Sequence, residues 1–523
     1  MRFSEKNMMS ENTTKQIRFG AVLSYGQMIM SIIVGIVYTP IMIRKFGQSE
    51  YGLYNTAASV ISMLSILSLG FGSGYLKFYA QYKTVDKKQS IYRLNGLFMI
   101  VFSIIGIVAL IIGLFLTTHL EMVYNDGLTD KEYRIAKILM LLLTLNLSIS
   151  FPMSVFNTIL SANERFIFQK IIGMGKTIVA PLLIIPLLFA GYKSIVVVSI
   201  NVLLAIIVDV LNIFYVIHIL HERFIFFGFE KGLFKSMFVY TSFILINTIV
   251  GQINWNIDKI LLGRFQGTAS VAIYSVASSL HIYYENFSTS VSNVFRTRVH
   301  VIVNSFNNDS LEQRNQLTTL MIKVGRIQFV ILGLVFTGFI FFGKQFIVRY
   351  WAGADYAESY SIAILLMLCS SIVLIQNVGI DIQRALDKHK FRSIAYLFMS
   401  AINLVVTIIL CKIWGALGAA IGTAMSVIIV DGLIMNYYYF KQCNIDIVLF
   451  WKDISRESLG LILPILFGIF CVYINQINSM IIYLSTIILY IIIYLVSIYA
   501  ISLNREEKNY VNRILSKLYR RIV

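Results

Sequence analysis

The sequence predicts an all-α integral membrane protein of about 14 transmembrane helices, arranged as two parallel six-helix repeats followed by two C-terminal helices. Three observations predict this fold: the apolar composition, the sidedness of the basic residues, and an internal repeat. Of the 523 residues, 58% are apolar and only 13% are charged, against about a quarter in ordinary soluble chains. A soluble domain has no interior large enough for this apolar surface, and disordered chains are poor in such residues.

Fourteen apolar runs are long enough to cross a bilayer, which takes about 20 residues per helix. Their hydrophobicity is continuous and does not alternate with period two, so we expect helices and not the strands of a barrel. The first run shows no cleavage site, and we expect it to be retained as a span. The runs cover residues 17–43, 52–76, 94–116, 138–160, 166–190, 194–220, 236–262, 268–294, 324–343, 360–382, 391–411, 415–440, 457–475 and 479–503.

The basic residues are distributed unequally between the two sides of the predicted bundle. With the N-terminus inside, 33 of the 44 Lys and Arg residues fall on the cytoplasmic side and 11 on the opposite side. This bias follows the positive-inside rule and predicts that both termini are cytoplasmic. The net charge of +18 is therefore a signal of membrane topology, and we expect no nucleic-acid partner.

Three pairs of similar segments recur at nearly the same offset, which indicates a duplication of six spans. The offsets are 220, 225 and 222 residues, and an even number of spans per copy makes the repeats parallel. We therefore predict an N-terminal lobe at 1–230, a second lobe at 231–441, and a segment at 442–523 with helices 13 and 14 and a basic tail. The pairs are Phe46-Gly47 to Ser59 with Phe265-Gln266 to Ser279, Asn163 to Phe166 with Lys388 to Phe391, and Ile207 to Leu211 with Ile429 to Leu433.

Several loose motifs occur along the whole chain. They are Gly35 to Pro40, Phe46-Gly47 with Glu50-Tyr51-Gly52-Leu53-Tyr54, Leu69-Gly70-Phe71-Gly72-Ser73-Gly74 with Lys77, Asp258 to Gly263, and Gly415 to Ala424. Together they resemble the polysaccharide-transporter branch, the O-antigen flippase type, of the multidrug/oligosaccharidyl-lipid/polysaccharide exporter superfamily. The predicted 6+6+2 arrangement agrees with that branch.

The resemblance implies a transporter, not an enzyme, that has a V-shaped fold like that of multidrug exporters. Its substrate would be an undecaprenyl-diphosphate-linked oligosaccharide, translocated across the bacterial cytoplasmic membrane by alternating access for O-antigen, capsule or exopolysaccharide synthesis. The implied partners are that lipid-linked substrate, the membrane lipid, and the polymerase and chain-length proteins of the same pathway.

Other functions stay open at this point. An ion-coupled drug or cation antiporter usually has twelve spans, which the appended pair disfavours, whereas a flippase of the peptidoglycan precursor lipid II also has fourteen. A membrane-embedded polymerase or glycosyltransferase predicts a large outer loop, and the loops here are short.

Ionisable residues inside predicted spans are candidate functional residues, because charge is costly in hydrocarbon. Four cations could line a cavity and bind the diphosphate, and three acids could carry a coupling ion or pair with a cation. Asp209 and Asp431 are repeat-related, and Arg296 and Arg298 flank the repeat equivalent of Lys77. The cations are Lys77, Lys176, Arg296 and Arg298, and the acids are Asp209, Asp431 and Glu285.

Charged residues at the ends of spans are candidate gates. We expect Asp258, Lys259 and Arg264 to pair across the outer side with Arg44 and Lys45. Asp381 and Arg384 are the inner-gate candidates. We expect no cofactor, no metal site and no catalytic residues, and we expect the tail from Lys508 to Arg521 to form a basic amphipathic helix at the membrane surface.

Overall fold

The computed structural model describes an all-helical chain, which confirms the predicted fold class. The backbone is described except at residues 1, 69, 86, 125–127, 230–231, 307–309, 389, 474–478 and 523. Side chains are in addition not described at residues 2–18, 20–21, 240, 242–244, 246–247, 255, 514–515 and 517–522. The described part contains α-helices, short 3₁₀ and π turns, and no β-strand.

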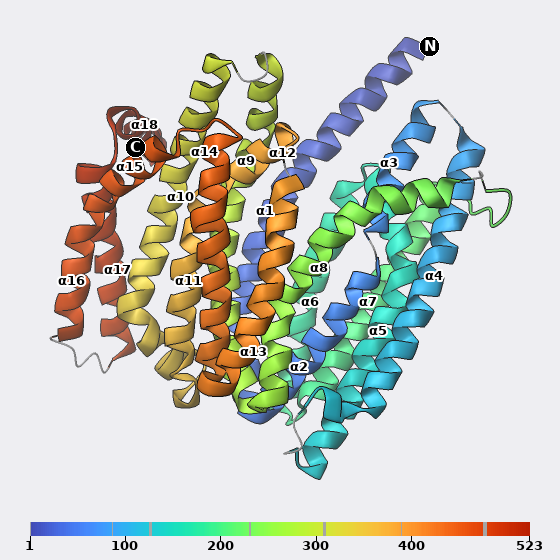
Figure 1. Cartoon of the computed structure of the whole chain (residues 1–523), viewed down its shortest axis with the longest axis horizontal. Helices are drawn as coiled ribbons and strands as arrows, with labels where there is room; N and C mark the ends of the chain where they lie inside the picture. Colours follow the sequence, from blue (N-terminus) through green and yellow to red (C-terminus); the bar gives the residue numbers. More distant parts are fainter. Residues whose placement is uncertain are drawn as a thin grey trace. The chain divides into compact units, whose positions relative to one another are not determined.

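Eighteen α-helices follow one another in the described backbone (Figure 1). The first eight are α1 (Arg2–Phe46), α2 (Gln48–Met63), α3 (Phe71–Thr84), α4 (Lys88–Thr118), α5 (Asp130–Ala162), α6 (Phe166–Phe189), α7 (Ser194–Phe214) and α8 (Leu233–Phe265). The others are α9 (Thr268–Ser305), α10 (Leu311–Gln345), α11 (Ser359–Ile375), α12 (Val378–Ala385), α13 (Lys390–Val427), α14 (Met435–Lys441), α15 (Ile447–Glu457), α16 (Ile462–Tyr473), α17 (Met480–Ser497) and α18 (Arg505–Ile522).

Eleven helical segments of the described chain are long and apolar enough to cross a membrane. One of them, Lys390–Lys441, has 52 residues, or about 78 Å of helix, more than twice the thickness of a bilayer core. It breaks at Gly415, where φ is 56° and ψ is −132°, the first residue of the predicted span 415–440. Helices α8 and α9 cover the predicted spans 236–262 and 268–294. The protein is thus a multi-pass membrane protein, and the count of fourteen spans stays a prediction.

The chain divides into two compact units. Unit 1 comprises Met1–Ser275 with Ser400–Ala419, and unit 2 comprises Val276–Met399 with Ala420–Val523. Unit 1 therefore contains all of the predicted N-terminal lobe and also α8. The lobe boundaries inferred from the repeat stay a prediction.

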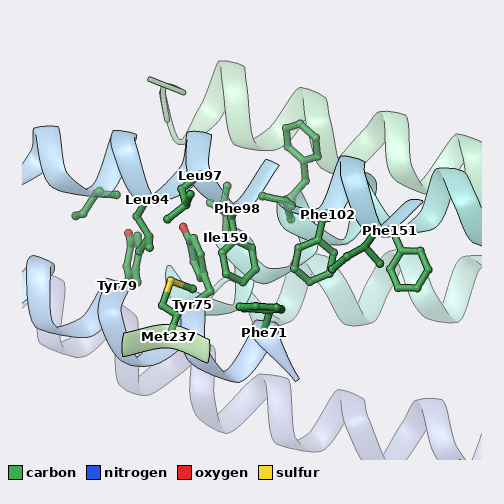
Figure 2. Close-up of a cluster of buried hydrophobic side chains, with 14 of the residues drawn as sticks. Phe71, Tyr75, Tyr79, Leu94, Leu97, Phe98, Phe102, Phe151, Ile159 and Met237 are labelled. Carbon is green, nitrogen blue, oxygen red and sulfur yellow. The ribbon is translucent and has the colours of Figure 1, made fainter. Parts of the chain in front are cut away.

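Unit 1 is held together by aromatic packing between α3, α4 and α5. Figure 2 shows this cluster, in which Phe71 and Tyr75 of α3 lie against Phe98 and Phe102 of α4. The ring centroids of Tyr75 and Phe98 are 4.8 Å apart, with an edge-on geometry. The hydroxyl of Tyr75 donates to the side-chain oxygen of Asn95 over 2.6 Å, so its one polar group is satisfied inside the cluster.

A connecting segment packs closely against a glycine in each unit. In unit 1 the segment follows the predicted sixth span and the glycine is near the start of the third. In unit 2 the segment follows the predicted twelfth span and the glycine is near the start of the ninth. In unit 1, a Cβ on Gly96 of α4 would lie 2.0 Å from the carbonyl oxygen of Ile225. In unit 2, a Cβ on Gly325 of α10 would lie 2.6 Å from the ring of Phe450. The close approach of the two segments requires the absence of a side chain at each glycine.

Tyrosines of α17 attach the C-terminal helix pair to α10 in unit 2. Helices α16 and α17 lie side by side (Figure 1) and both contact α10. The hydroxyl of Tyr490 donates to Thr337 Oγ1 over 2.8 Å, and that of Tyr494 donates to the Val330 carbonyl over 2.8 Å. Hydrocarbon offers no alternative partner for a buried hydroxyl, so these bonds favour a fixed register between the helices.

Within unit 2, Arg326 of α10 joins α15 and α18 to α10. Its guanidinium donates to Asp453 over 2.9 Å and to both carboxylate oxygens of Glu507 over 2.8 Å. Burial alone would raise the pKa of Glu507, but the hydrogen bonds from Arg326 and from the Asn504 backbone lower it below its usual value. The predicted C-terminal tail helix is confirmed as α18, and its place at the membrane surface stays a prediction.

Replacing Gly96 by alanine tests the close approach of the connector to α4. We expect Gly96→Ala to destabilise the protein by about 1–3 kcal/mol, because the new methyl group collides with backbone. The measurement is thermal unfolding in detergent. Gly175→Ala, on α6 with no atom within 4 Å of the added Cβ, is the matched control and should be neutral or slightly stabilising. Equal stability of the two variants would contradict the packing described.

Candidate functional site

A lysine and an aspartate lie near one another within the apolar helices of unit 1. Lys176 is on α6 and Asp209 is on α7, and both side chains are half-buried. The two interact electrostatically, but no salt bridge within 4.0 Å joins them. The structure therefore brings together two candidate residues that the sequence placed on different spans.

Amide side chains on neighbouring helices add hydrogen-bonding groups to this part of unit 1. Gln169 Nε2 donates to Asn157 Oδ1 over 2.7 Å, which links α6 to α5. The amide of Gln27 on α1 lies against Gly173, one turn before Lys176, with Nε2 2.5 Å from where a Cβ would be. Sequence reasoning did not single out these amides, although their occurrence inside apolar runs is the signal that could have found them.

Asp431 lies in a charged network in unit 2. It is 3% exposed and sits in a π-helical turn, Ile428–Ile434, a distortion frequent at functional sites. Arg392 of α13 lies 3.6 Å from Asp431 Oδ1, and the hydroxyl of Tyr396 donates to the same oxygen. Arg392 also donates to the Tyr396 hydroxyl over 2.6 Å. The network compensates the charge of a deeply buried carboxylate.

The repeat-related acids thus have comparable partners in the two units. In each unit, the acid lies in the predicted sixth or twelfth span, and the cation comes from the span before it. Asp431 is buried and directly paired with Arg392, whereas Asp209 is half-buried and only near Lys176. The sequence indicated the two acids, but not that Arg392 and Tyr396 would partner one of them.

Glu285 of α9, which the sequence presents as an isolated acid, has a histidine one turn before it. His281 Nε2 lies 3.9 Å from Glu285 Oε1 and 2.9 Å from the hydroxyl of Ser370 on α11. Two titratable groups therefore share one largely buried position in unit 2.

The inner-gate candidates form a cluster around Asp381 of α12. Asp381 is 5% exposed and accepts from Arg296 Nε over 3.1 Å, with Arg384 Nη1 at 3.6 Å. Arg298 is exposed on α9, and Lys77 is exposed on α3 in the other unit. The structure brings Arg296 to Asp381 and Arg384, and the symmetric relation of Lys77 with Arg296 and Arg298 stays a prediction.

The outer-gate candidates of unit 1 contact one another and other residues of the unit. Asp258, 1% exposed, accepts a hydrogen bond from the Tyr274 hydroxyl, and Lys259 interacts with it electrostatically. Arg264 Nη1 donates to the Tyr124 carbonyl over 2.9 Å. Lys45 Nζ lies 4.3 Å from the centre of the Phe189 ring, and Arg44 is exposed. Their role as an outer gate stays a prediction.

Within the described residues, no group of three or more His, Cys, Asp or Glu side chains could hold a metal ion. The four cysteines are free thiols, three of them buried.

These features define a class: a multi-pass helical membrane protein with ionisable groups inside its spans. The sequence profile of the family described as "Polysaccharide biosynthesis protein" matches residues 18–294, more than half of the chain. The chain therefore belongs to this polysaccharide biosynthesis protein family. A search of curated protein sequences finds no significant match.

Solved structures of transporters share the fold. The chain is similar to a structure titled "Lipid II flippase MurJ, inward closed conformation", with a TM-score of 0.68, 20% identity, and coverage of 92% of this chain and 97% of that one. An inward-facing multidrug resistance MATE transporter of the MOP superfamily gives a TM-score of 0.57 at 14% identity and covers 80% of this chain and 99% of its own. A mutant of the Vibrio cholerae MATE transporter VcmN gives 0.54 at 14% identity, with 83% and 99% covered.

Removing Asp431 or Asp209 tests whether the acid of unit 2 is more strongly paired than the acid of unit 1. We expect Asp431→Ala to destabilise the protein by about 3 kcal/mol or more, because it leaves the Arg392 charge without its carboxylate. We expect Asp209→Ala, the matched control, to cost less than about 1 kcal/mol, since Asp209 is half-exposed and forms no direct salt bridge. Thermal unfolding in detergent measures both, and a larger loss for Asp209→Ala would contradict the assignment.

Proposed function

We propose that the protein is a flippase that moves undecaprenyl-diphosphate-linked oligosaccharide repeat units across the bacterial cytoplasmic membrane by alternating access. The products would be O-antigen, capsule or exopolysaccharide, and the polymerase and chain-length proteins of that pathway would be its partners. The observation that carries the proposal is membership of the polysaccharide biosynthesis family in a chain with a transporter fold. In this proposal both termini are cytoplasmic, and the protein acts as a transporter and not as an enzyme.

The extent of the fold likeness supports a lipid-linked substrate over a drug. The match to the MurJ structure covers 92% of this chain. The matches to the two MATE structures cover 80% and 83% of this chain, although each covers 99% of the MATE chain. The difference is consistent with the appended helix pair, which twelve-span antiporters lack. The same observation favours a second candidate, a lipid II flippase, and the head group on the lipid diphosphate distinguishes the two substrates.

Lys176 has the chemistry that a diphosphate requires. The substrate's anionic group must cross about 30 Å of hydrocarbon, and a cation along the way offsets its charge. Because Asp209 lies near Lys176 without a direct salt bridge, the ammonium group keeps hydrogen-bond donors for a phosphate oxygen, and Asp209 compensates its charge between substrates. The amides of Gln169 and Asn157 supply donors and acceptors of the kind that sugars bind.

Glu285 and His281 supply a site for a coupling proton. A carboxyl group and an imidazole 3.9 Å apart can share or exchange one proton, and both lie in a largely buried position. Asp209 and Asp431 remain the other proposed ion sites. In this proposal a proton or sodium gradient drives the return of the empty transporter.

Neutralising the proposed phosphate-binding lysines should lower export. We expect Lys176→Met and Lys77→Met to reduce surface polysaccharide and to accumulate lipid-linked repeat units, because each variant removes a cation that offsets the diphosphate charge. Polysaccharide immunoblots of cells carrying each variant measure this, with membrane fractions verifying the amount of protein. Lys131→Met, an exposed lysine on α5, is the control. Normal export with both variants would contradict the role of the cations.

The coupling acids can be tested in vesicles. We expect substrate uptake by the reconstituted protein to increase with a proton or sodium gradient, and Glu285→Gln to weaken that dependence while preserving binding, because glutamine cannot release a proton. The variant His281→Gln shows whether the imidazole of His281 contributes to the same gradient dependence. If uptake is the same with and without each gradient, Asp209, Asp431 and Glu285 are not ion sites.

A further inference from the structure

The connector between α7 and α8 exposes two phenylalanines in a non-helical segment. It follows the π-helical turn Tyr215–Ile219 and runs to α8 at Leu233. Phe224 and Phe229 pack against the aromatic cluster of unit 1. Phe226, which stacks on Phe224, and Phe227 are outside the cluster and are 50% and 77% exposed. Two aromatic residues of the segment thus pack inside unit 1, and two are exposed at its surface.

The exposed phenylalanines sit on a loop whose shape is fixed by hydrogen bonds. The Glu222 carboxylate accepts from Asn95 Nδ2 over 3.1 Å and from Asn163 Nδ2 over 3.3 Å, so it ties the loop to α4 and to the end of α5. The backbone N–H of Ile225 donates to the Tyr92 carbonyl over 2.9 Å. A loop held at three points presents its aromatic side chains without a further ordering cost on binding.

A half-buried cation lies beside the same loop. The guanidinium of Arg93 approaches to 3.5 Å the position that a Cβ on Gly228 would take. Its Nε is buried and makes no hydrogen bond within the described structure. Arg223 on the loop and Lys87 and Lys88 at the start of α4 are exposed. Basic side chains therefore occur on the loop and at the start of α4, the helix to which the loop is bonded.

The ends of two membrane-spanning segments place the loop at the membrane boundary. It begins where the candidate span Ser194–Ile219 ends and is bonded to the start of the candidate span Lys88–Thr118. At this level aromatic rings insert below the headgroups while basic side chains contact lipid phosphates. A water-exposed pair of phenylalanines would be costly at the same place.

We propose that residues 224–229 form a lipid anchor, in which Phe226 and Phe227 insert into the bilayer interface and Arg93 binds the phosphate of an acidic phospholipid. The anchor holds unit 1 at the leaflet that contains the Lys77-to-Arg93 segment, predicted to be cytoplasmic, where acidic lipids attract basic side chains. Gly228 within this segment has a positive φ of 72°, and Gly232, directly before α8, has a positive φ of 86°. The proposal concerns the bulk lipid and does not depend on the transported substrate.

Spin labels on the loop test the anchor in the full-length protein. The parent is Cys471→Ala, since the other three cysteines are buried, and the label is placed with Phe227→Cys or, as the matched control, Arg223→Cys. In phosphatidylcholine vesicles containing one-third phosphatidylglycerol, we expect the label at 227 to collide with oxygen more than with a water-soluble nickel chelate, at a depth of about 5–10 Å. We expect the reverse preference at 223.

Two results would overturn the anchor. Free access of the nickel chelate to position 227 would mean that the loop faces water, and protection from both collision partners would mean that another protein or a second copy covers it. The arginine is tested by adding Arg93→Gln. Omitting phosphatidylglycerol should reduce the depth at 227 when Arg93 is present and should have no effect in Arg93→Gln. The same dependence on phosphatidylglycerol with Arg93 and with Arg93→Gln would show that Arg93 binds no phosphate. Lys131→Gln is the charge-matched control.

Discussion

A hydrocarbon bilayer offers no hydrogen bonds and hardly screens charge, and this constraint governs every polar group inside the helical units. Asp431 is compensated by Arg392 and Tyr396, Asp381 by two arginines, and the hydroxyls of the α17 tyrosines by groups of α10. Apart from the Arg384–Asp381 pair within α12, these contacts join different helices or turns, so groups that are costly to bury also fix how the helices pack. Stability and the position of functional groups therefore depend on the same contacts.

The two units meet this constraint to different degrees. In unit 2 the acid of the twelfth predicted span is fully paired, which makes it a structural centre. In unit 1 the equivalent acid only approaches its lysine, so both groups keep capacity for another partner. In the proposed function, this asymmetry makes unit 1 the part that binds an anion. A transporter needs such incomplete compensation, because a fully satisfied site has nothing to offer a substrate.

The sequence predicted the helical fold because an apolar run of about 20 residues has a simple physical cause, whereas the count of fourteen spans stays a prediction. It also indicated Asp209, Asp431 and Glu285, since isolated charges stand out in apolar runs. It did not predict the partners Arg392, Tyr396 and His281, because a contact between helices depends on their packing and rotation. The π-helical turn at Asp431 has no local sequence signal, and the fixed connector at Glu222 depends on amides distant along the chain.

Movement of a lipid-linked oligosaccharide by the purified protein tests the central claim most directly. Vesicles would carry a fluorescent polyprenyl-diphosphate oligosaccharide in the inner leaflet, with a membrane-impermeant glycosidase outside. The account predicts that the sugar becomes accessible to the glycosidase only in vesicles that contain the protein. Protection that persists in the presence of folded protein, together with transport of a cationic drug by the same vesicles, would contradict it.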